Sequence, residues 1–267
     1  MTVAPPLIAF THVGKRFDGG PGAEPVRAVD DFSLEVAACE FLAIVGGSGS
    51  GKTTLLRLVN RLIDADQGQI TVQGEDVQAL DPVTLRRRVG YVFQSGGLFP
   101  HLTVAGNIGI TPKLIGMPAP AIASRVDELL DLVRLDRGRY RDRLPHELSG
   151  GQRQRVGVAR ALAAGPRIVL MDEPFGALDP LTRDALGEDY RALHDRLQLT
   201  TLMITHDMTE AILLADRVAV MHAGRLLAQG TAAELAASPD RYVSELLRTP
   251  RRQAERLNRL LPRHSGP

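Results

Sequence analysis

One strand-loop-helix segment constrains the fold of this chain more than any other feature. The apolar run 41–45 has the composition of a buried strand, and it leads directly into a loop of the pattern G-x-x-x-x-G-K-[ST], namely Gly46-Gly47-Ser48-Gly49-Ser50-Gly51-Lys52-Thr53-Thr54. Glycines let the backbone N–H groups of such a loop turn inward around the phosphates of a nucleotide. Lys52 is then expected to reach the β- and γ-phosphates, and the Thr53 hydroxyl to bind Mg²⁺. The leucine-rich segment behind the loop predicts a helix whose positive N-terminus adds to this anion site. The alternative is a plain glycine-rich turn, which does not require a Lys-Thr pair at these positions.

The composition restricts the class of protein. The 267 residues are 44% apolar and 24% charged, which is ordinary for a globular protein and enough for one α/β domain or slightly more. Lysine and arginine number 32 against 31 acidic residues, so no overall field attracts nucleic acid and no nucleic-acid partner is predicted. No window approaches the ~18 to 20 apolar residues of a membrane-spanning helix, and the N-terminus lacks the pattern of an export signal. We therefore expect neither a membrane span nor export. The single cysteine, Cys39, lies beside a predicted buried strand and is interpreted as a small core residue.

Strands alternate with helices along most of the chain. Strands are predicted at 7–17, 28–36, 41–45, 69–72, 89–93, 167–172, 201–205, 218–221 and 226–228, and helices at 52–60, 181–197, 208–215 and directly after Asp81. From residue 95 to about residue 165 the apolar period becomes helical, which predicts a helical insertion within one α/β domain. The alternation indicates a mostly parallel sheet, and ligands of such sheets bind at the carboxyl ends of the strands. Gly46, Gln94, Asp172 and His206 all fall at such ends.

Two carboxylates close the apolar strand at 168–172. Phosphoryl transfer to water requires neutralised charge, a placed metal and an oriented water. Asp172 is expected to hold Mg²⁺ through water, and Glu173 to orient or deprotonate the attacking water. Gln94 is expected to contact the metal or that water, and His206 to donate to a γ-phosphate. As alternatives, the acid pair caps a helix and His206 is a packed or capping histidine.

A second candidate anion site begins at Ser149. Ser149 is placed to cap a long helix, and Gly150 and Gly151 leave the first backbone N–H groups of that helix uncovered, with Gln152 following. Because the loop at 46–54 already provides one anion site, a second one makes sense if two chains stack head to tail. Each nucleotide would then lie between the loop of one chain and the Ser149 helix end of the other.

These motifs together resemble a known family. The loop at 46–54, Gln94, LSGGQ at 148–152, IVLMDEP at 168–174, Ala177-Leu178-Asp179 and His206 are similar to the nucleotide-binding subunit of ATP-binding-cassette (ABC) transporters over about residues 7 to 245. The resemblance implies a P-loop NTPase of α/β class: a RecA-like core with a mostly parallel sheet, an antiparallel β-subdomain and an inserted α-helical subdomain at about 95–165. The domain would then span 1–245, followed by a basic tail at 246–267.

The resemblance also implies roles and partners. It implies a dimer that encloses ATP, hydrolysis with Glu173 as catalytic base and His206 as the γ-phosphate switch, Phe17 stacked on adenine, and Asp179 among the nucleotide-contacting residues. ATP and Mg²⁺ would be bound. The partners would be a second nucleotide-binding subunit, transmembrane permease subunits and an extracytoplasmic solute-binding protein. The chain would then lie as a peripheral subunit at the cytoplasmic face of the inner membrane.

Within the family, segments 60–63, 85–94 and 97–104 look most like importers of glycine betaine, choline, carnitine and similar osmoprotectants. The alternatives are an importer ATPase for another small polar solute such as an amino acid, and an ABC ATPase outside transport. The chain departs from the family pattern at Gly47, where many relatives have proline, and in a Gly/Pro-rich insert at 19–25. Many osmoprotectant subunits carry a tandem CBS module after the cassette, and regulation through such a module is not expected here. The arginine-rich tail predicts a solvated helix or a foothold on anionic lipid.

The glycines after Gln94 predict a hinge into the helical insertion. Leu98 and Phe99 follow them as apolar residues in a loop. They are expected either to lie in the core of the insertion or to receive a cytoplasmic helix of the permease.

Overall fold

The computed structural model describes residues 5–18, 24–94 and 96–260. Most of the Gly/Pro-rich insert, Ser95 and the last residues of the basic tail therefore lie outside the described part of the chain.

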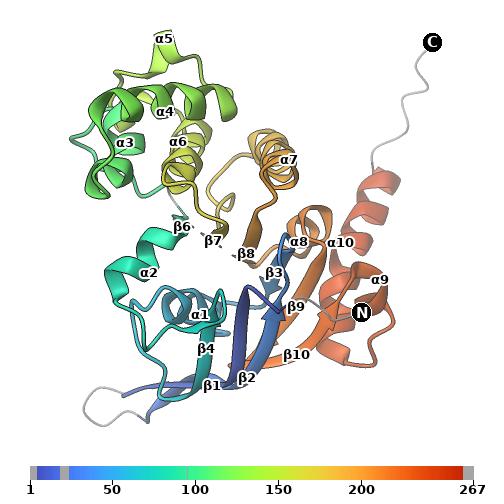
Figure 1. Cartoon of the computed structure of the whole chain (residues 1–267). Coiled ribbons are helices and arrows are strands. Elements are labelled where there is room, and N and C mark those ends of the chain that lie inside the picture. The colour runs from blue at the N-terminus through green and yellow to red at the C-terminus, as the bar shows by residue number, and fades with distance from the viewer. Residues whose placement is uncertain (1–4, 19–23, 95, 261–267) are drawn as a thin grey trace.

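A six-stranded sheet forms the centre of the molecule (Figure 1). Its strands, in spatial order, are β10 (Arg225–Gly230), β9 (Arg217–His222), β3 (Phe41–Val45), β8 (Thr200–Thr205), β7 (Ile168–Asp172) and β6 (Val89–Val92). All neighbours are parallel except the β9–β10 pair. The prediction of a mostly parallel sheet is confirmed.

The central strand β3 shows why its sequence is a continuous apolar run. All five of its residues are buried. Phe41, Ala43 and Val45 belong to one hydrophobic cluster, whereas Leu42 and Ile44 belong to a second cluster on the other face. A strand covered on both faces has no water-facing side on which polar residues would alternate.

Helices and a second sheet supply the two coverings. The first cluster includes residues of α6 (Gly150–Leu162), α7 (Pro180–Leu197), α8 (Met208–Leu214), α9 (Ala232–Ala236) and α10 (Arg241–Leu260). The second cluster includes α1 (Lys52–Val59) and an antiparallel sheet of β2 (Val26–Val36), β1 (Ile8–Phe17), β4 (Gln67–Val72) and β5 (Glu75–Asp76), in that order.

The chain between β6 and β7 is helical. It contains α3 (Val104–Leu114), α4 (Ala119–Leu132), α5 (Arg137–Tyr140), a 3₁₀ turn (Pro145–Glu147) and α6, which stand together beside the central sheet at the upper left of Figure 1. The helical apolar period of this segment is carried by five residues, of which Val126, Leu129, Leu130 and Val133 are buried and Ile122 is partly buried. A further helix, α2 (Pro82–Arg88), precedes β6. Asp81 caps it by accepting a hydrogen bond from Thr84 N–H, as its sequence predicts.

The C-terminal helix α10 is attached to the body only by its first half. The first half of α10 packs on the body through the buried Val243 and Leu247, whereas residues 251–260 are exposed. The expected domain boundary at 245/246 therefore falls inside this helix, and the division of the chain stays a prediction.

The interpretation of Cys39 as a core residue is wrong, because Cys39 is exposed in a turn with a φ of 60°. Among the helices of the described residues, none is long and apolar enough to span a bilayer.

Candidate nucleotide-binding and hydrolysis site

The loop between β3 and α1 can be built only with glycine at two of its positions. A Cβ on Gly46 would lie 2.1 Å from the carbonyl oxygen of Met221. Gly51 has a φ of 101°, and a Cβ there would lie 2.0 Å from the carbonyl oxygen of Ala28. The helix α1 begins directly after Gly51 without a side-chain cap. Its first N–H groups are therefore left for an anion, which the dipole of the helix also favours.

Lys52 lies inside this loop. Its ammonium donates to the carbonyl oxygens of Gly46 and Gly47 at 2.8 and 3.0 Å and to Ser50 Oγ at 3.3 Å. The side chain is buried, and burial lowers its pKa against the opposing charges of Glu173 and Asp172. A buried ammonium that bonds to neutral oxygens is a strong attractor for phosphate oxygens. Of the other predicted loop residues, Ser48 and Gly49 are exposed and Thr54 is half-buried in the first turn of α1.

Asp172 ends β7 next to the start of α1. Its Oδ1 lies 3.5 Å from Thr53 Oγ1, and its Oδ2 accepts a hydrogen bond from Tyr91 OH at 3.3 Å. Burial, together with the nearby charge of Glu173, raises the pKa of Asp172. Burial and the charge of Asp172 likewise raise the pKa of Tyr91. Sequence reasoning missed Tyr91. The signal lay in β6, where Tyr91 pairs with Leu170, two residues before Asp172 on the same face of the neighbouring strand.

Glu173 lies where three strand ends meet. Its Oε2 accepts a hydrogen bond from Gln94 Nε2 at 3.0 Å and lies 3.2 Å from His206 Nδ1. Its backbone has a φ of 44°, which is uncommon for a residue with a side chain, and its N–H bonds to the carbonyl oxygen of Ile204 at 3.0 Å. Such backbone strain clusters at functional sites. The structure thus brings together three of the predicted site residues around one carboxylate.

The oxygens of this site suit magnesium that is shared with a phosphate. In the residues that the structure describes, no group of three or more His, Cys, Asp or Glu side chains could hold a metal by itself. Mg²⁺ is usually bound by one or two protein oxygens together with substrate phosphates and water. Thr53 and Asp172 provide such a pair, a hydroxyl and a carboxylate, beside the phosphate loop.

Ser149 caps α6 with reciprocal hydrogen bonds. Its Oγ accepts from Gln152 N at 3.3 Å, and Gln152 Oε1 accepts from Ser149 N at 2.9 Å. A Cβ on Gly151 would lie 2.5 Å from Thr182 Cγ2, and Asp179 caps α7 by accepting from Thr182 N at 3.0 Å. Hydrogen bonding to Thr182 also lowers the pKa of Asp179. Within the described part of the chain, the hydrogen bonds of Ser149 and Asp179 do not reach the phosphate loop.

A family model described as ABC transporter matches residues 29–176. The chain belongs to the ABC transporter family. The match covers β2 to the turn after Glu173, and so it contains the phosphate loop, Gln94, the Ser149 cap and both carboxylates.

Curated relatives share nearly half of the sequence. The choline transport ATP-binding protein OpuBA of Bacillus subtilis is 47% identical over 243 residues, which are 90% of this chain and 62% of that protein. The glycine betaine uptake system ATP-binding protein YehX of Escherichia coli is 47% identical over 84% of this chain and 70% of that protein. A sulfate/thiosulfate import ATP-binding protein, CysA 2 of Chromobacterium violaceum, is 48% identical over 82% of this chain and 59% of that protein. The present chain thus spans about three fifths of the length of OpuBA.

Solved ABC structures have the same fold. The dimeric ATP-binding cassette MJ0796, in a post-hydrolysis state bound to ADP and Pi, is 30% identical with a TM-score of 0.76, over 84% of this chain and 98% of that one. The protein cbiO1 from Clostridium perfringens, part of the ABC transporter complex cbiONQ, is 26% identical with a TM-score of 0.79, over 94% of this chain and 99% of that one. These likenesses confirm the predicted P-loop NTPase fold of the ABC cassette.

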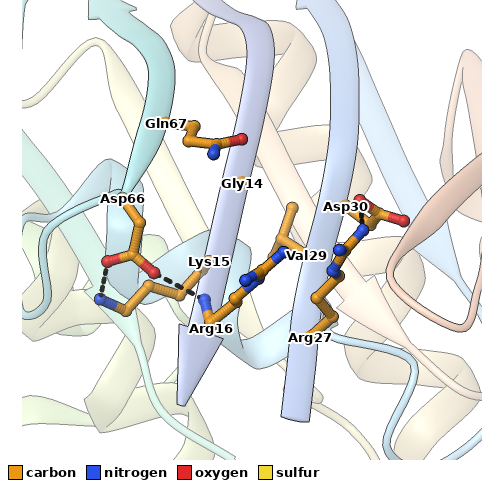
Figure 2. A pocket seen from close by; sticks show the side chains of 8 residues that line it. All are labelled: Gly14, Lys15, Arg16, Arg27, Val29, Asp30, Asp66 and Gln67. Atoms are coloured by element: carbon orange, nitrogen blue, oxygen red, sulfur yellow. Dashed lines mark hydrogen bonds and ion pairs between the residues drawn. The ribbon is translucent and has the colours of Figure 1, made fainter. Parts of the chain in front are cut away.

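Phe17, the predicted adenine-stacking residue, lies at the end of β1 and is 40% exposed. A hollow of about 210 Å³ opens between β1, β2 and the start of β4, and Phe17 is not among the residues that line it (Figure 2). Two charged pairs in its walls are internal, because Lys15 Nζ lies 2.7 Å from Asp66 and Arg27 lies 3.1 Å from Asp30. Arg16 also lines the hollow, and among the described residues its guanidinium forms no ion pair.

Two buried polar side chains that sequence reasoning missed hold the segment after Gln94. Asn107 is fully buried; it accepts from Phe99 N at 2.8 Å and donates to Phe99 O and Leu102 O at 3.1 and 3.0 Å. Arg160 donates to the carbonyl oxygens of Gly96 and Gly97 at 2.8 and 2.7 Å. Leu98 and Phe99 were expected either in the core of the helical insertion or at a contact with the permease. Leu98 packs against the core, and Phe99 is 44% exposed. Asn107 and Arg160 stand in apolar helical stretches with no local pattern, so only the packed structure reveals them.

Proposed function

We propose that this chain binds and hydrolyses ATP and powers an ABC importer of an osmoprotectant such as glycine betaine, choline or carnitine. The observation that carries the hydrolytic part is Glu173, whose carboxylate receives Gln94 and His206 next to a loop with the lysine of a phosphate site. The transport part rests on relatives such as OpuBA and YehX, whose names state choline transport and glycine betaine uptake.

In the proposed mechanism, the loop residues from Gly46 to Thr54 hold the phosphates of ATP. Lys52 exchanges the carbonyl oxygens of Gly46 and Gly47 for phosphate oxygens, since its ammonium gains a charged partner. Thr53 and Asp172, with Gln94 close by, would hold Mg²⁺, which neutralises charge on the phosphates.

Glu173 performs the proton transfer. A water oxygen attacks the γ-phosphorus, the bond from that phosphorus to the ADP oxygen breaks, and the water proton passes to the Glu173 carboxylate. Gln94 and His206 fix the direction of this carboxylate through its Oε2. His206 would also donate to the γ-phosphate as charge develops.

The second half of the site would come from another copy. Ser149, Gly150, Gly151 and Gln152 of one chain would close on the nucleotide held by the loop of the partner, with Asp179 beside them and Phe17 stacked on adenine. The contact of Gly151 with Thr182 supports a joint movement of the Ser149 segment and the Asp179 turn. MJ0796, a dimeric relative in its solved form, supports the same arrangement.

The remaining proposed partners are transmembrane permease subunits and an extracytoplasmic solute-binding protein, with this chain peripheral at the cytoplasmic face of the membrane. Within this proposal, residues 1–245 form the nucleotide-binding domain, 95–165 its helical subdomain, and 246–267 a basic tail. The exposed Phe99 lies beside a hollow of about 170 Å³ between α2, β6, α3 and α6, whose lining includes Phe93 and Arg160. It is the proposed contact for a permease helix.

A second candidate solute class has support in the comparisons. The relative named for sulfate/thiosulfate import is 48% identical to this chain, and OpuBA and YehX are each 47% identical. Identity alone therefore does not select the solute, and an importer of another small polar solute is the alternative. Uptake of labelled glycine betaine, choline and sulfate, measured in cells with this chain and with its Glu173→Gln variant, separates the two.

The hydrolytic proposal is tested with Glu173→Gln. The amide cannot take a proton, so hydrolysis should fall at least ~10²-fold while ATP binding persists. Because ATP is no longer hydrolysed, the variant should accumulate as a dimer when ATP is present. Size-exclusion chromatography with and without ATP measures this dimer. Normal turnover, or a variant that stays monomeric at saturating ATP, would remove Glu173 from this role.

The two-chain site is tested by mixing inactive variants. Ser149→Arg should abolish hydrolysis without greatly weakening ATP binding to one chain, and Lys52→Ala should abolish hydrolysis by losing the phosphate contact. A mixed dimer contains one site with both Lys52 and Ser149 intact, so about one competent site should return. A large loss of ATP affinity in the Ser149→Arg monomer contradicts this arrangement.

A further inference from the structure

The first turn of α10 touches the phosphate loop. The Tyr242 hydroxyl accepts a hydrogen bond from Gly47 N–H at 3.1 Å, across 195 positions of sequence. The tyrosine ring also lies 4.3 Å from the ring of His222, which ends β9. The C-terminal helix is therefore in direct contact with the proposed ATP site.

Tyr242 is held in place by its own helix. Val243 and Leu247 are buried on the body of the protein, and Val243 N–H bonds to Asp240 Oδ1 at 3.0 Å at the start of α10. A ring that packs against His222 at a tilt of 43° and stands on such an anchored turn has little freedom to follow the loop. The hydrogen bond therefore restrains Gly47 of the loop, and not the tyrosine.

Before ATP binds, this contact and Lys52 hold one peptide unit from both ends, and the contact with Tyr242 remains when Lys52 turns to the phosphates. Gly47 N–H and the carbonyl group of Gly46 belong to the same planar trans peptide, so they point in opposite directions. The carbonyl oxygen accepts from Lys52 Nζ at 2.8 Å inside the loop, whereas the N–H bonds to Tyr242 outside it. This clamp depends on Gly47, because a proline at that position would have no N–H to donate.

We infer that Tyr242 is a positioning residue for ATP binding: it fixes the Gly46–Gly47 peptide and so holds the phosphate loop in a binding-ready shape. Glycine-rich loops lose much conformational freedom on binding, and a loop that is already fixed has less to lose. The inference rests on the proposed ATP site. It also makes the position of α10 a determinant of ATP affinity.

The test compares Tyr242→Phe with the wild-type chain. Phenylalanine keeps the ring beside His222 and removes only the hydroxyl, so ATP should bind about 2- to 10-fold more weakly, the range for one net hydrogen bond. The turnover number at saturating Mg-ATP should change less than twofold, so the loss appears in KM. A merely structural role would lower the melting temperature and the amount of active protein without this split between KM and kcat.

A double-mutant cycle identifies the hydrogen bond itself. Gly47→Pro removes the donor, so Tyr242→Phe should add no further loss of affinity in that background. Gly47→Ala keeps the N–H, and its Cβ would lie 3.4 Å from the Tyr242 hydroxyl, which is ordinary contact. Tyr242→Phe should therefore still weaken ATP binding in the Gly47→Ala background.

The outcomes separate this inference from the function on which it rests. If the wild-type chain binds no ATP, the proposed function fails. If the wild type binds ATP and Tyr242→Phe binds it equally well or more tightly, the positioning role of Tyr242 is overturned. Should Gly47→Pro not fold, the Tyr242→Phe comparison alone, with and without Gly47→Ala, still decides the inference.

Discussion

Glu210 makes the stability of this protein depend on pH in a direction that can be calculated. It lies in the first turn of α8, and its side chain is 9% exposed. One carboxyl oxygen bonds to Thr205 Oγ1, and the other is buried without a partner. Burial is the main cause that raises its pKa from 4.5 to about 6, with the nearby charge of Asp207 acting in the same direction and Arg183 and His206 opposing it.

The sign follows from which state holds the proton. A pKa that is higher in the folded state means that the folded protein binds the proton more tightly than the unfolded chain does. The stabilisation is therefore complete below about pH 4.5, falls as the pH rises, and is lost above about pH 6. A rise of about 1.5 in pKa corresponds to ~2 kcal/mol of unfolding free energy.

The matched variant is Glu210→Gln, which keeps the shape and cannot titrate. Urea unfolding of both proteins from pH 4 to pH 7.5 gives the difference in unfolding free energy, in which the other titrating groups cancel. This difference, wild type minus variant, should fall by about 2 kcal/mol between about pH 4.5 and 6. Glu188, which is exposed on α7, supplies the control, because Glu188→Gln makes the same chemical change on the surface. Parallel stability curves for wild type and Glu210→Gln would refute the argument.

Two further predictions concern the segment after Gln94. Asn107→Ala removes four hydrogen bonds from a fully buried side chain and should lower the unfolding free energy by about 3 kcal/mol, measured by urea unfolding; a loss below ~1 kcal/mol would show that the segment is held by other contacts. Phe99→Asp should leave the melting temperature and the ATPase activity of the isolated chain nearly unchanged while abolishing co-purification with the permease, because Phe99 is exposed; Leu98→Asp, on the core side, should destabilise the chain instead. Unfolding of Phe99→Asp would place Phe99 in the core.

Sequence reasoning predicted the parts of the site that a short sequence pattern records. The phosphate loop needs glycine at 51 for a positive φ, and glycine at 46 and 51 because the loop closely approaches Met221 and Ala28 in other strands. The pattern of the loop contains these glycines although two of their reasons are tertiary contacts. Helix caps such as Asp81 and Ser149 also act within three residues of their partners. Such caps can be predicted without knowledge of the tertiary structure.

The features that sequence reasoning missed join distant segments. Tyr91 and Asp172 are 81 positions apart, and Tyr242 and Gly47 are 195 positions apart. Nothing near Tyr242 in the sequence distinguishes it from a tyrosine at an ordinary helix start. Cys39 failed for a related reason, since its apolar neighbours in β3 suggested burial while the turn with positive φ turns it to the surface.

The catalytic group falls between these extremes. A parallel sheet puts all carboxyl ends of its strands at one edge, so the alternation of strands and helices was enough to bring Gln94, Glu173 and His206 to the same side of the molecule. Which of them is central depends on the strand order. In the order β8-β7-β6, Glu173 follows the middle strand, and the neighbouring strands end in His206 and, through Phe93, in Gln94. His206 Nδ1 and Gln94 Nε2 consequently both reach Glu173 Oε2, at 3.2 and 3.0 Å, although β8 and β6 do not pair with each other. The middle position explains why the proton acceptor of the proposed reaction is Glu173 and why its two partners act through it.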